Sequence, residues 1–281
     1  MCIRDRLLVV WQWKYAKTIP IPEEKKEALP NYSSMLETEN AQSYNTFLEA
    51  CREKSDFEQF LLIGGDAGMG HFFYPHPIPV TETQKHSAYP GCYALSKVLE
   101  EVMLEQYQIQ YSLPSTCLRA PWIMEKDDFK YSLSFGDDVF GGPVWKDLVS
   151  QELAKKYEKA GNIPLMLNEK GEPIKRNFIH VDDLVQAIMQ AILLPDKANE
   201  NTFNISMDTP VDYGEVSKYL KDSRGIESIP IKTQYHSTWL DNSKAKFLLD
   251  WKPKIGLKEL IDLSWNYERS NDDPRKIWYP G

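Results

Sequence analysis

Tyr93 and Lys97 are the two residues of this chain whose types and spacing point most directly to chemistry. Four positions separate them, so on a helix their side chains lie one turn apart on the same face. An ammonium group beside a phenol favours the phenolate, which makes the tyrosine a usable proton acceptor near neutral pH. Oxidation of a sugar hydroxyl at a nicotinamide needs such a base. The structural alternative for the same pair is a solvated helix face.

The segments that surround this pair predict an α/β protein built on a parallel sheet. Short apolar runs predict strands, and apolar residues at helical spacing predict helices. Strands that alternate with helices indicate a parallel sheet. Asp182 or Asp183 is expected to cap a helix that ends at Leu194. Strands are predicted at residues 7–11, 60–63, 115–120 and 177–181, helices at 39–54 and 93–107, and loops at 19–30, 64–70 and 75–90.

Composition and charge exclude several classes of partner. The net charge is −8 and the basic residues are scattered, which argues against a nucleic-acid partner. No apolar run approaches the length of about 18 residues that a membrane-spanning helix needs. Cys2, Cys51, Cys92 and Cys117 lack paired spacing, and the five histidines lack metal-ligand spacing. We therefore expect a cytoplasmic protein with reduced thiols, no metal site and no membrane partner.

Six segments follow one another in the order of the motifs of one enzyme family. Arg-Asn-Phe-Ile-His-Val-Asp-Asp at 176–183 resembles the family's R-D-F-I-H-V-D-D, and Tyr93 and Lys97 fall where it carries a catalytic Tyr-x-x-x-Lys. On these segments the chain resembles the extended short-chain dehydrogenases, the NAD-dependent epimerase/dehydratase family of nucleotide-sugar enzymes. The six segments are residues 39–51, 93–97, 118–121, 176–183, 202–205 and 240–253.

The resemblance implies roles for residues of the nicotinamide site. Tyr93 would remove the hydroxyl proton while hydride passes to NAD or NADP. Lys97 would hold Tyr93 as phenolate and contact the cofactor ribose. Asn40, Pro121 and Ile123 would also contact the cofactor.

The resemblance further implies that Arg176 binds the diphosphate of a nucleotide-sugar. A guanidinium suits this task because it donates two parallel hydrogen bonds. We expect Arg176 at the mouth of the cleft, and the alternative is a surface arginine beside the acidic stretch 169–172. His180 is expected to be a packed core histidine.

The start of the chain departs from the family. The glycine-rich fingerprint that cradles a pyrophosphate is absent, and Val9 to Trp11 resembles the family's fourth strand. Residues 1–6 fit no family element. We therefore expect a truncated sheet with an unpaired edge near Leu7 to Trp11, and weak or no binding of NAD(P) by this chain alone.

The turn after the second predicted strand is the second departure. The family places a Ser or Thr there to bind the substrate hydroxyl, and the aligned residue is Gly65. Dehydratases carry Thr-Asp-Glu, and the aligned residues are Gly65, Asp66 and Ala67. Asp66 is therefore a candidate catalytic residue, with a simple turn residue as the alternative. Epimerisation or oxidation is favoured over dehydration.

Together these observations predict a Rossmann-like, doubly wound parallel sheet in residues 1–125 and 176–206. A smaller substrate-binding lobe is predicted in 126–175 and 207–281. The predicted function is that of an NAD(P)-dependent epimerase or oxidoreductase acting on a nucleotide-sugar. The alternatives are a reductase of another small carbonyl compound and a non-catalytic nucleotide-binding relative. A second copy of the chain is a candidate partner.

Overall fold

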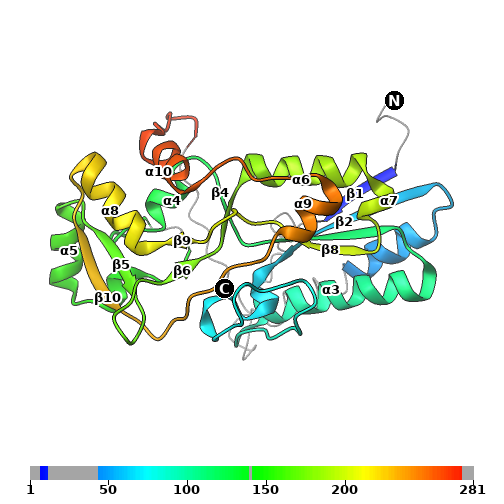
Figure 1. The fold of residues 1–281 in the computed structure, drawn as a ribbon, viewed down its shortest axis with the longest axis horizontal. Coiled ribbons are helices and arrows are strands. Elements are labelled where there is room, and N and C mark those ends of the chain that lie inside the picture. Colours follow the sequence, from blue (N-terminus) through cyan, green and yellow to red (C-terminus); the bar gives the residue numbers. More distant parts are fainter. Residues whose placement is uncertain (1–6, 12–43, 139–140, 274–281) are drawn as a thin grey trace, which may run out of the picture.

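The structure is a computed structural model that describes residues 7–11, 44–138 and 141–273. Its main sheet has the strand order β1-β2-β3-β8, and every neighbouring pair is parallel (Figure 1). The strands predicted at residues 7–11, 60–63 and 115–120 are confirmed, and β1 forms one edge of the sheet in the described part. The bounds are β1 Leu7–Trp11, β2 Phe57–Gly65, β3 Ser115–Ala120 and β8 Asn201–Asn204.

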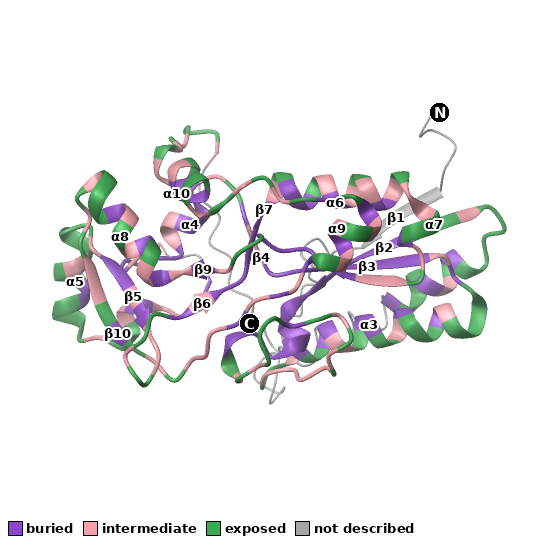
Figure 2. Ribbon diagram, in the orientation of Figure 1, coloured by how far each residue is buried: buried purple, intermediate pink, exposed green. Residues whose placement is uncertain are grey.

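The sequence of β2 explains why this strand lies in the centre. Its residues from Gln59 to Gly65 are all buried, as the purple strands of Figure 2 show. Successive side chains of a strand point to opposite faces. Phe60 and Leu62 pack into one hydrophobic cluster, whereas Leu61 and Ile63 pack into another. A strand buried on both faces is typical of a parallel sheet covered by helices on each side.

Two groups of helices supply those covers. On one face lie the helix at residues 44–52 and α3 (Cys92–Tyr111), which contribute Leu48 and Leu104 to the cluster of Phe60. On the other face lie α6 (Val181–Leu193) and α9 (Ser243–Leu249). The helix predicted at 93–107 is therefore confirmed and is longer than expected. Of the helix predicted at 39–54, residues 39–43 lie outside the described part.

A third hydrophobic cluster forms a lobe beside the sheet, at the left of Figure 1. Its centre is a parallel pair of strands flanked by helices, and short strand pairs connect it with the sheet. The lobe strands are β5 Ile163–Leu167 with β10 Ser228–Lys232, and the connecting pairs are β4 Trp122–Met124 with β7 Phe178–His180 and β6 Lys175–Arg176 with β9 Val211–Asp212. The helices are α4 Asp128–Tyr131, η5 Trp145–Leu148, α5 Gln151–Lys159, α8 Tyr213–Arg224 and α10 Leu257–Asn266.

The division of the chain into two domains stays a prediction at the level of its boundaries. The packing adds that α9 lies against the sheet, because Ala245 and Leu249 belong to the same cluster as Leu61 of β2. The chain therefore returns from the lobe to the sheet before α10 enters the lobe again. The short helix α7 (Pro195–Ala198) connects α6 with β8.

Two local predictions were wrong. Residues 64–70 are not a loop, because β2 continues to Gly65 and the 3₁₀ helices η3 (Asp66–Met69) and η4 (His71–Phe73) follow. The helix α6 is capped by His180, whose Nδ1 accepts the backbone N–H of Asp182 at 3.2 Å. Asp183 is fully buried instead, and its carboxylate accepts the backbone N–H groups of Lys254 and Ile255 at 2.9 Å each.

Candidate active site

Tyr93 and Lys97 lie near the start of α3, next to the end of β2. Gly91 caps this helix with a φ of 138°, a conformation that favours glycine. A Cβ added at Gly65 would lie 3.6 Å from Cδ of Lys97, so the lysine stem passes over the last residue of β2. The pair is thus next to the carboxyl end of the sheet, where open α/β sheets bind their ligands.

Lys97 is paired with a carboxylate of its own helix. Its Nζ donates to Oε2 of Glu100 at 2.8 Å, and both side chains are buried. The same Nζ lies 6.0 Å from the centre of the Tyr93 ring. The ammonium of Lys97 is therefore much closer to the Glu100 carboxylate than to the Tyr93 ring, and Glu100 offsets its positive charge.

The pKa of Tyr93 differs from our expectation. Burial raises the pKa of the phenol well above its usual range, and the carboxylates of Asp66 and Glu100 raise it further. We expected Lys97 to favour the phenolate, but in this structure the environment keeps the proton on Tyr93 at neutral pH. Tyr93 can therefore become a phenolate, the form that accepts a proton, only after the charges around it change.

Asp66 begins a buried chain of three ionisable residues. Its Oδ2 lies 2.7 Å from Nδ1 of His71, and Nε2 of His71 lies 2.7 Å from Nη2 of Arg176. A guanidinium only donates, so Nε2 accepts and the His71 proton sits on Nδ1, where it is donated to Asp66. Burial lowers the pKa of His71, Asp66 raises it and Arg176 lowers it, with a net lowering. A neutral His71 therefore orients the Asp66 carboxylate.

We expected Arg176 at the mouth of a cleft, but the structure buries it. Only 1% of it is exposed, and its guanidinium lies 4.0 Å from the ring centre of Phe72 and 4.3 Å from that of Trp122. Its Nη1 donates to the carbonyl of Gly142 at 3.3 Å. Its Nε is buried without a hydrogen-bond partner. The guanidinium therefore keeps a buried N–H group, that of Nε, without a partner in this conformation.

A second buried ion pair lies further along α3. Arg119 of β3 donates from Nε and Nη2 to Glu101 at 3.1 and 2.7 Å, and His86 Nε2 lies 3.0 Å from the same carboxylate. Burial would raise the pKa of Glu101, but hydrogen bonds and charges of His86 and Arg119 outweigh it and lower the pKa to about 2. Arg119 also donates to Asn204 of β8 at 3.3 Å. This network ties α3 to two strands of the sheet.

The Glu101 network predicts a loss of stability in acid. The pKa of Glu101 is lower in the folded state than the value of about 4.3 expected for an unfolded glutamate. Its contribution to the free energy of unfolding is therefore complete above about pH 4.3 and is lost as the pH falls towards 2. Urea unfolding followed by circular dichroism should show this decline, and Glu101→Gln should flatten it. An equal decline in that variant would contradict the assignment.

The other predicted site residues are distributed as follows. Pro121 is buried directly after β3, and Ile123 lies in β4, so both follow the strand paired with β2. Asn40 lies outside the described residues. The backbone of Gly65 is extended, with φ −151° and ψ 149°, and the contacts of an added Cβ are ordinary. The fold therefore does not require glycine where the family carries a hydroxyl.

These positions fit the nicotinamide half of a dinucleotide. Gly65 ends β2, Pro121 follows the neighbouring β3, and the stem of Lys97 from α3 would lie 3.6 Å from a Cβ added at Gly65. Tyr93 and Lys97 offer a phenol and an ammonium from one helix. The residues present therefore suit that part of the cofactor.

Two residues of this site were missed by the sequence analysis. Glu100 stands three positions after Lys97, and this spacing alone places it on the same helix face, so it could have been found. His71 gave no such signal, because its partner Arg176 is 105 positions away in the sequence.

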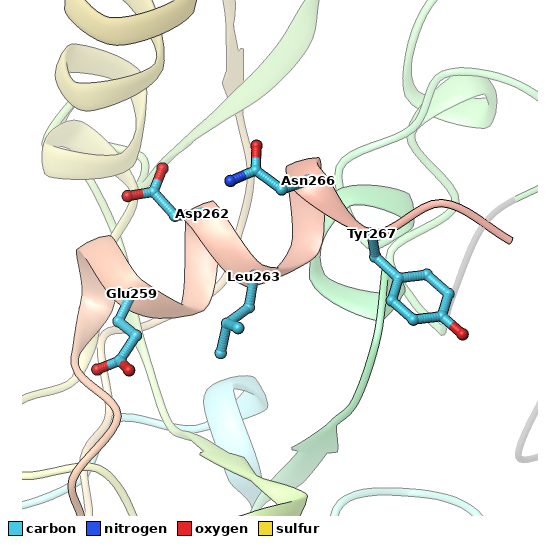
Figure 3. A pocket seen from close by; sticks show the side chains of 5 residues that line it. All are labelled: Glu259, Asp262, Leu263, Asn266 and Tyr267. Carbon is cyan, nitrogen blue, oxygen red and sulfur yellow. The ribbon is translucent and has the colours of Figure 1, made fainter.

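An open pocket lies beside α10 in the lobe. Its lining residues project from α10 and from the position that follows it (Figure 3): Glu259, Asp262, Leu263, Asn266 and Tyr267. Asp262 already accepts the Tyr219 hydroxyl at 2.7 Å and Arg224 at 2.9 Å. The helix packs against α4 and α8 in the lobe. None of the residues that line this pocket is a predicted site residue.

Three further features of the described part of the chain concern metal ligands, cysteine thiols and the apolarity of its helices. No group of three or more His, Cys, Asp or Glu side chains there is arranged to hold a metal ion. Cys51, Cys92 and Cys117 are free thiols. No described helix is both long and apolar enough to cross a membrane.

The chain is similar in sequence to curated proteins of known activity. Mitochondrial L-threonine 3-dehydrogenase of Sus scrofa is 25% identical over 183 residues, which are 62% of this chain and 45% of that protein. The chain thus spans less than half the length of this relative.

Solved structures share the fold. A short-chain dehydrogenase/reductase superfamily protein from Agrobacterium tumefaciens with bound NAD superposes with a TM-score of 0.67, at 17% identity, over 84% of this chain and 74% of its own. UDP-glucose 4-epimerase from Thermotoga maritima with UDP-glucose gives 0.60 at 21% identity, over 85% and 74%. These neighbours confirm the predicted α/β, Rossmann-like fold.

The sequence model of the NAD dependent epimerase/dehydratase family matches residues 31–206, which is more than half of the chain. The match includes β2, α3, β3 and α6, and with them Asp66, Tyr93, Lys97 and Arg176. It confirms the resemblance found in the motifs. The chain therefore belongs to the NAD dependent epimerase/dehydratase family.

Proposed function

We propose that this chain carries the catalytic residues of an NAD-dependent epimerase or oxidoreductase that acts on a nucleotide-sugar. The observation that supports this most is the position of Tyr93 and Lys97 on one helix, beside Gly65 at the carboxyl end of β2. Membership of an NAD-dependent family supports the cofactor. Solved neighbours that contain NAD or UDP-glucose support both parts of the proposal.

In this proposal Tyr93 exchanges a proton with the substrate hydroxyl. NAD, when bound, supplies the hydride acceptor. Lys97 stabilises the phenolate and binds the nicotinamide ribose, and Pro121 and Ile123 provide the wall beside it. The buried strand ends around Lys97 keep water from the reacting atoms. An epimerase would return the hydride to the other face of the keto sugar, whereas an oxidoreductase would release that product.

Asp66 serves as a second acid–base group in the same site. Its carboxylate is buried and accepts a hydrogen bond from Nδ1–H of His71. The negative charge of the carboxylate also raises the pKa of Tyr93. Ala67, at the position of the family's glutamate, offers no acid for a leaving hydroxyl. We therefore favour epimerisation or oxidation over dehydration.

Oxidoreduction of a small carbonyl or hydroxy compound is the second candidate function. The burial of Arg176 favours it, because a diphosphate clamp would first have to release His71 or Gly142. The relative named L-threonine 3-dehydrogenase also supports a substrate without a nucleotide.

Arg176 provides the experiment that separates these functions. If Arg176 binds a diphosphate, Arg176→Ala should weaken binding of a UDP-sugar by about 1.5–3 kcal/mol, and Arg176→Lys should recover only part of it. Titration calorimetry with the protein encoded by its complete gene measures this, and added salt should weaken the binding.

A ligand-side control avoids variants that fail to fold. Wild-type protein should bind UDP more tightly than uridine by a similar amount. Equal affinity for UDP and uridine would contradict the diphosphate role and favour the small-substrate function.

A further inference from the structure

Glu100 is a buried carboxylate that the proposed reaction does not use. Its side chain is 6% exposed, that of Lys97 is 5% exposed, and 2.8 Å separates the two charged atoms. Lys97 Nζ lies 6.0 Å from the ring centre of Tyr93. The group expected to act on the phenol and the ribose is therefore held by a closer partner.

The other ionisable groups that face this pair leave Glu100 as the principal anion beside Lys97. Asp66, from η3, accepts a hydrogen bond from His71. Glu101 is committed to Arg119 and His86. The remaining facing groups are neutral at pH 7, because burial raises their pKa values: Tyr44 from helix 44–52 and Cys117 from β3.

We propose that Glu100 is a positioning residue that holds Lys97 in reserve until the nicotinamide nucleotide binds. The proposal rests on the proposed function of Tyr93 and Lys97. Binding of the nucleotide offers the ammonium a ribose hydroxyl, and Lys97 then moves from Glu100 towards the ribose and Tyr93. The phenol becomes a usable base only in that bound state, so the free protein does not carry a reactive phenolate.

The test is Glu100→Gln in the complete protein, with Glu105→Gln as the matched control. Glutamine keeps the shape of Glu100 and accepts a hydrogen bond from Lys97 without its charge. Glu105 is an exposed glutamate of the same helix. Two quantities are measured: the affinity for NAD by calorimetry, and the titration of Tyr93 by NMR of ¹³C-labelled tyrosine, assigned with Tyr93→Phe.

We expect Glu100→Gln to bind NAD more tightly and to lower the midpoint of the Tyr93 titration by about 1–3 pH units, the scale for a charge within about 4–6 Å. Glu105→Gln should match wild type. Unchanged NAD affinity and an unchanged Tyr93 titration in Glu100→Gln would overturn the proposal, even if the variant is less stable, because a purely structural ion pair alters only stability.

A second measurement applies if Glu100→Gln does not fold. In wild type, saturating NAD should lower the midpoint of the Tyr93 titration, and an unmoved midpoint in the NAD complex would overturn the proposal. Absence of NAD binding by wild type would instead contradict the proposed function, so the two failures are distinguishable.

Discussion

Replacement of Tyr93 by Phe should lower the turnover of the complete protein by about 10²–10⁴-fold, the range for loss of a positioned acid–base group. The phenyl ring keeps the packing of a half-buried side chain, so the free energy of unfolding should change little. Substrate affinity should also persist, because the Tyr93 hydroxyl contributes to proton transfer in the reaction and not to binding of the substrate. Steady-state kinetics with a panel of nucleotide-sugars measures the effect.

Tyr111 offers the control for this substitution. It is a tyrosine at the last position of the same helix and is 47% exposed. Tyr111→Phe removes the same oxygen atom far along α3 from Tyr93 and should leave turnover unchanged. A comparable loss of activity in both variants would show that the helix, and not the Tyr93 hydroxyl, is the sensitive element.

Loss of Arg119 should cost the protein about 3–5 kcal/mol of unfolding free energy, the largest change in stability that we expect. Arg119→Met leaves Glu101 buried without the guanidinium that meets both of its oxygens. A second substitution, Glu101→Leu, removes the stranded charge. The double variant should therefore recover much of the loss, since apolar groups of similar volume replace a buried ion pair at little cost.

Urea unfolding of the two single variants and the double variant completes this cycle. The exposed pair Lys221–Glu227, whose side chains are 61% and 59% exposed, is the control, and Lys221→Met should leave the unfolding midpoint nearly unchanged. Equal effects of Arg119→Met and Lys221→Met would show that burial of the first pair contributes nothing.

The regular elements near Tyr93 could be predicted because pattern and packing agree there. The apolar run of β2 and the helical spacing of α3 are both explained by burial against neighbours. Prediction failed at residues 64–70, where several glycines suggested a loop although β2 continues to Gly65. It also failed at the start of α6, because the cap comes from His180, a residue type that is rarely considered for this position.

The sequence predicted which residues form the candidate site better than it predicted the charges and pKa values around them. The motifs placed Tyr93 and Lys97 on one helix, since spacing alone determines that. The charge balance depends on Glu100, and the orientation of Asp66 depends on His71 and the distant Arg176. Glu100 could have been found from its spacing, but the contact between His71 and Arg176 forms only when separate segments pack together. The burial that raises the pKa of Tyr93 and the burial of Arg176 also depend on this packing, so they could not be read from the sequence.

The most direct test of the central claim is a single turnover observed at the nicotinamide. The complete protein is loaded with NAD and mixed rapidly with a nucleotide-sugar, and the absorbance of reduced nicotinamide is followed. We predict that the absorbance rises in wild type and rises about 10²–10⁴-fold more slowly in Tyr93→Phe. Reduction of the nicotinamide at the same rate in both proteins would contradict the assignment of Tyr93 as the proton acceptor.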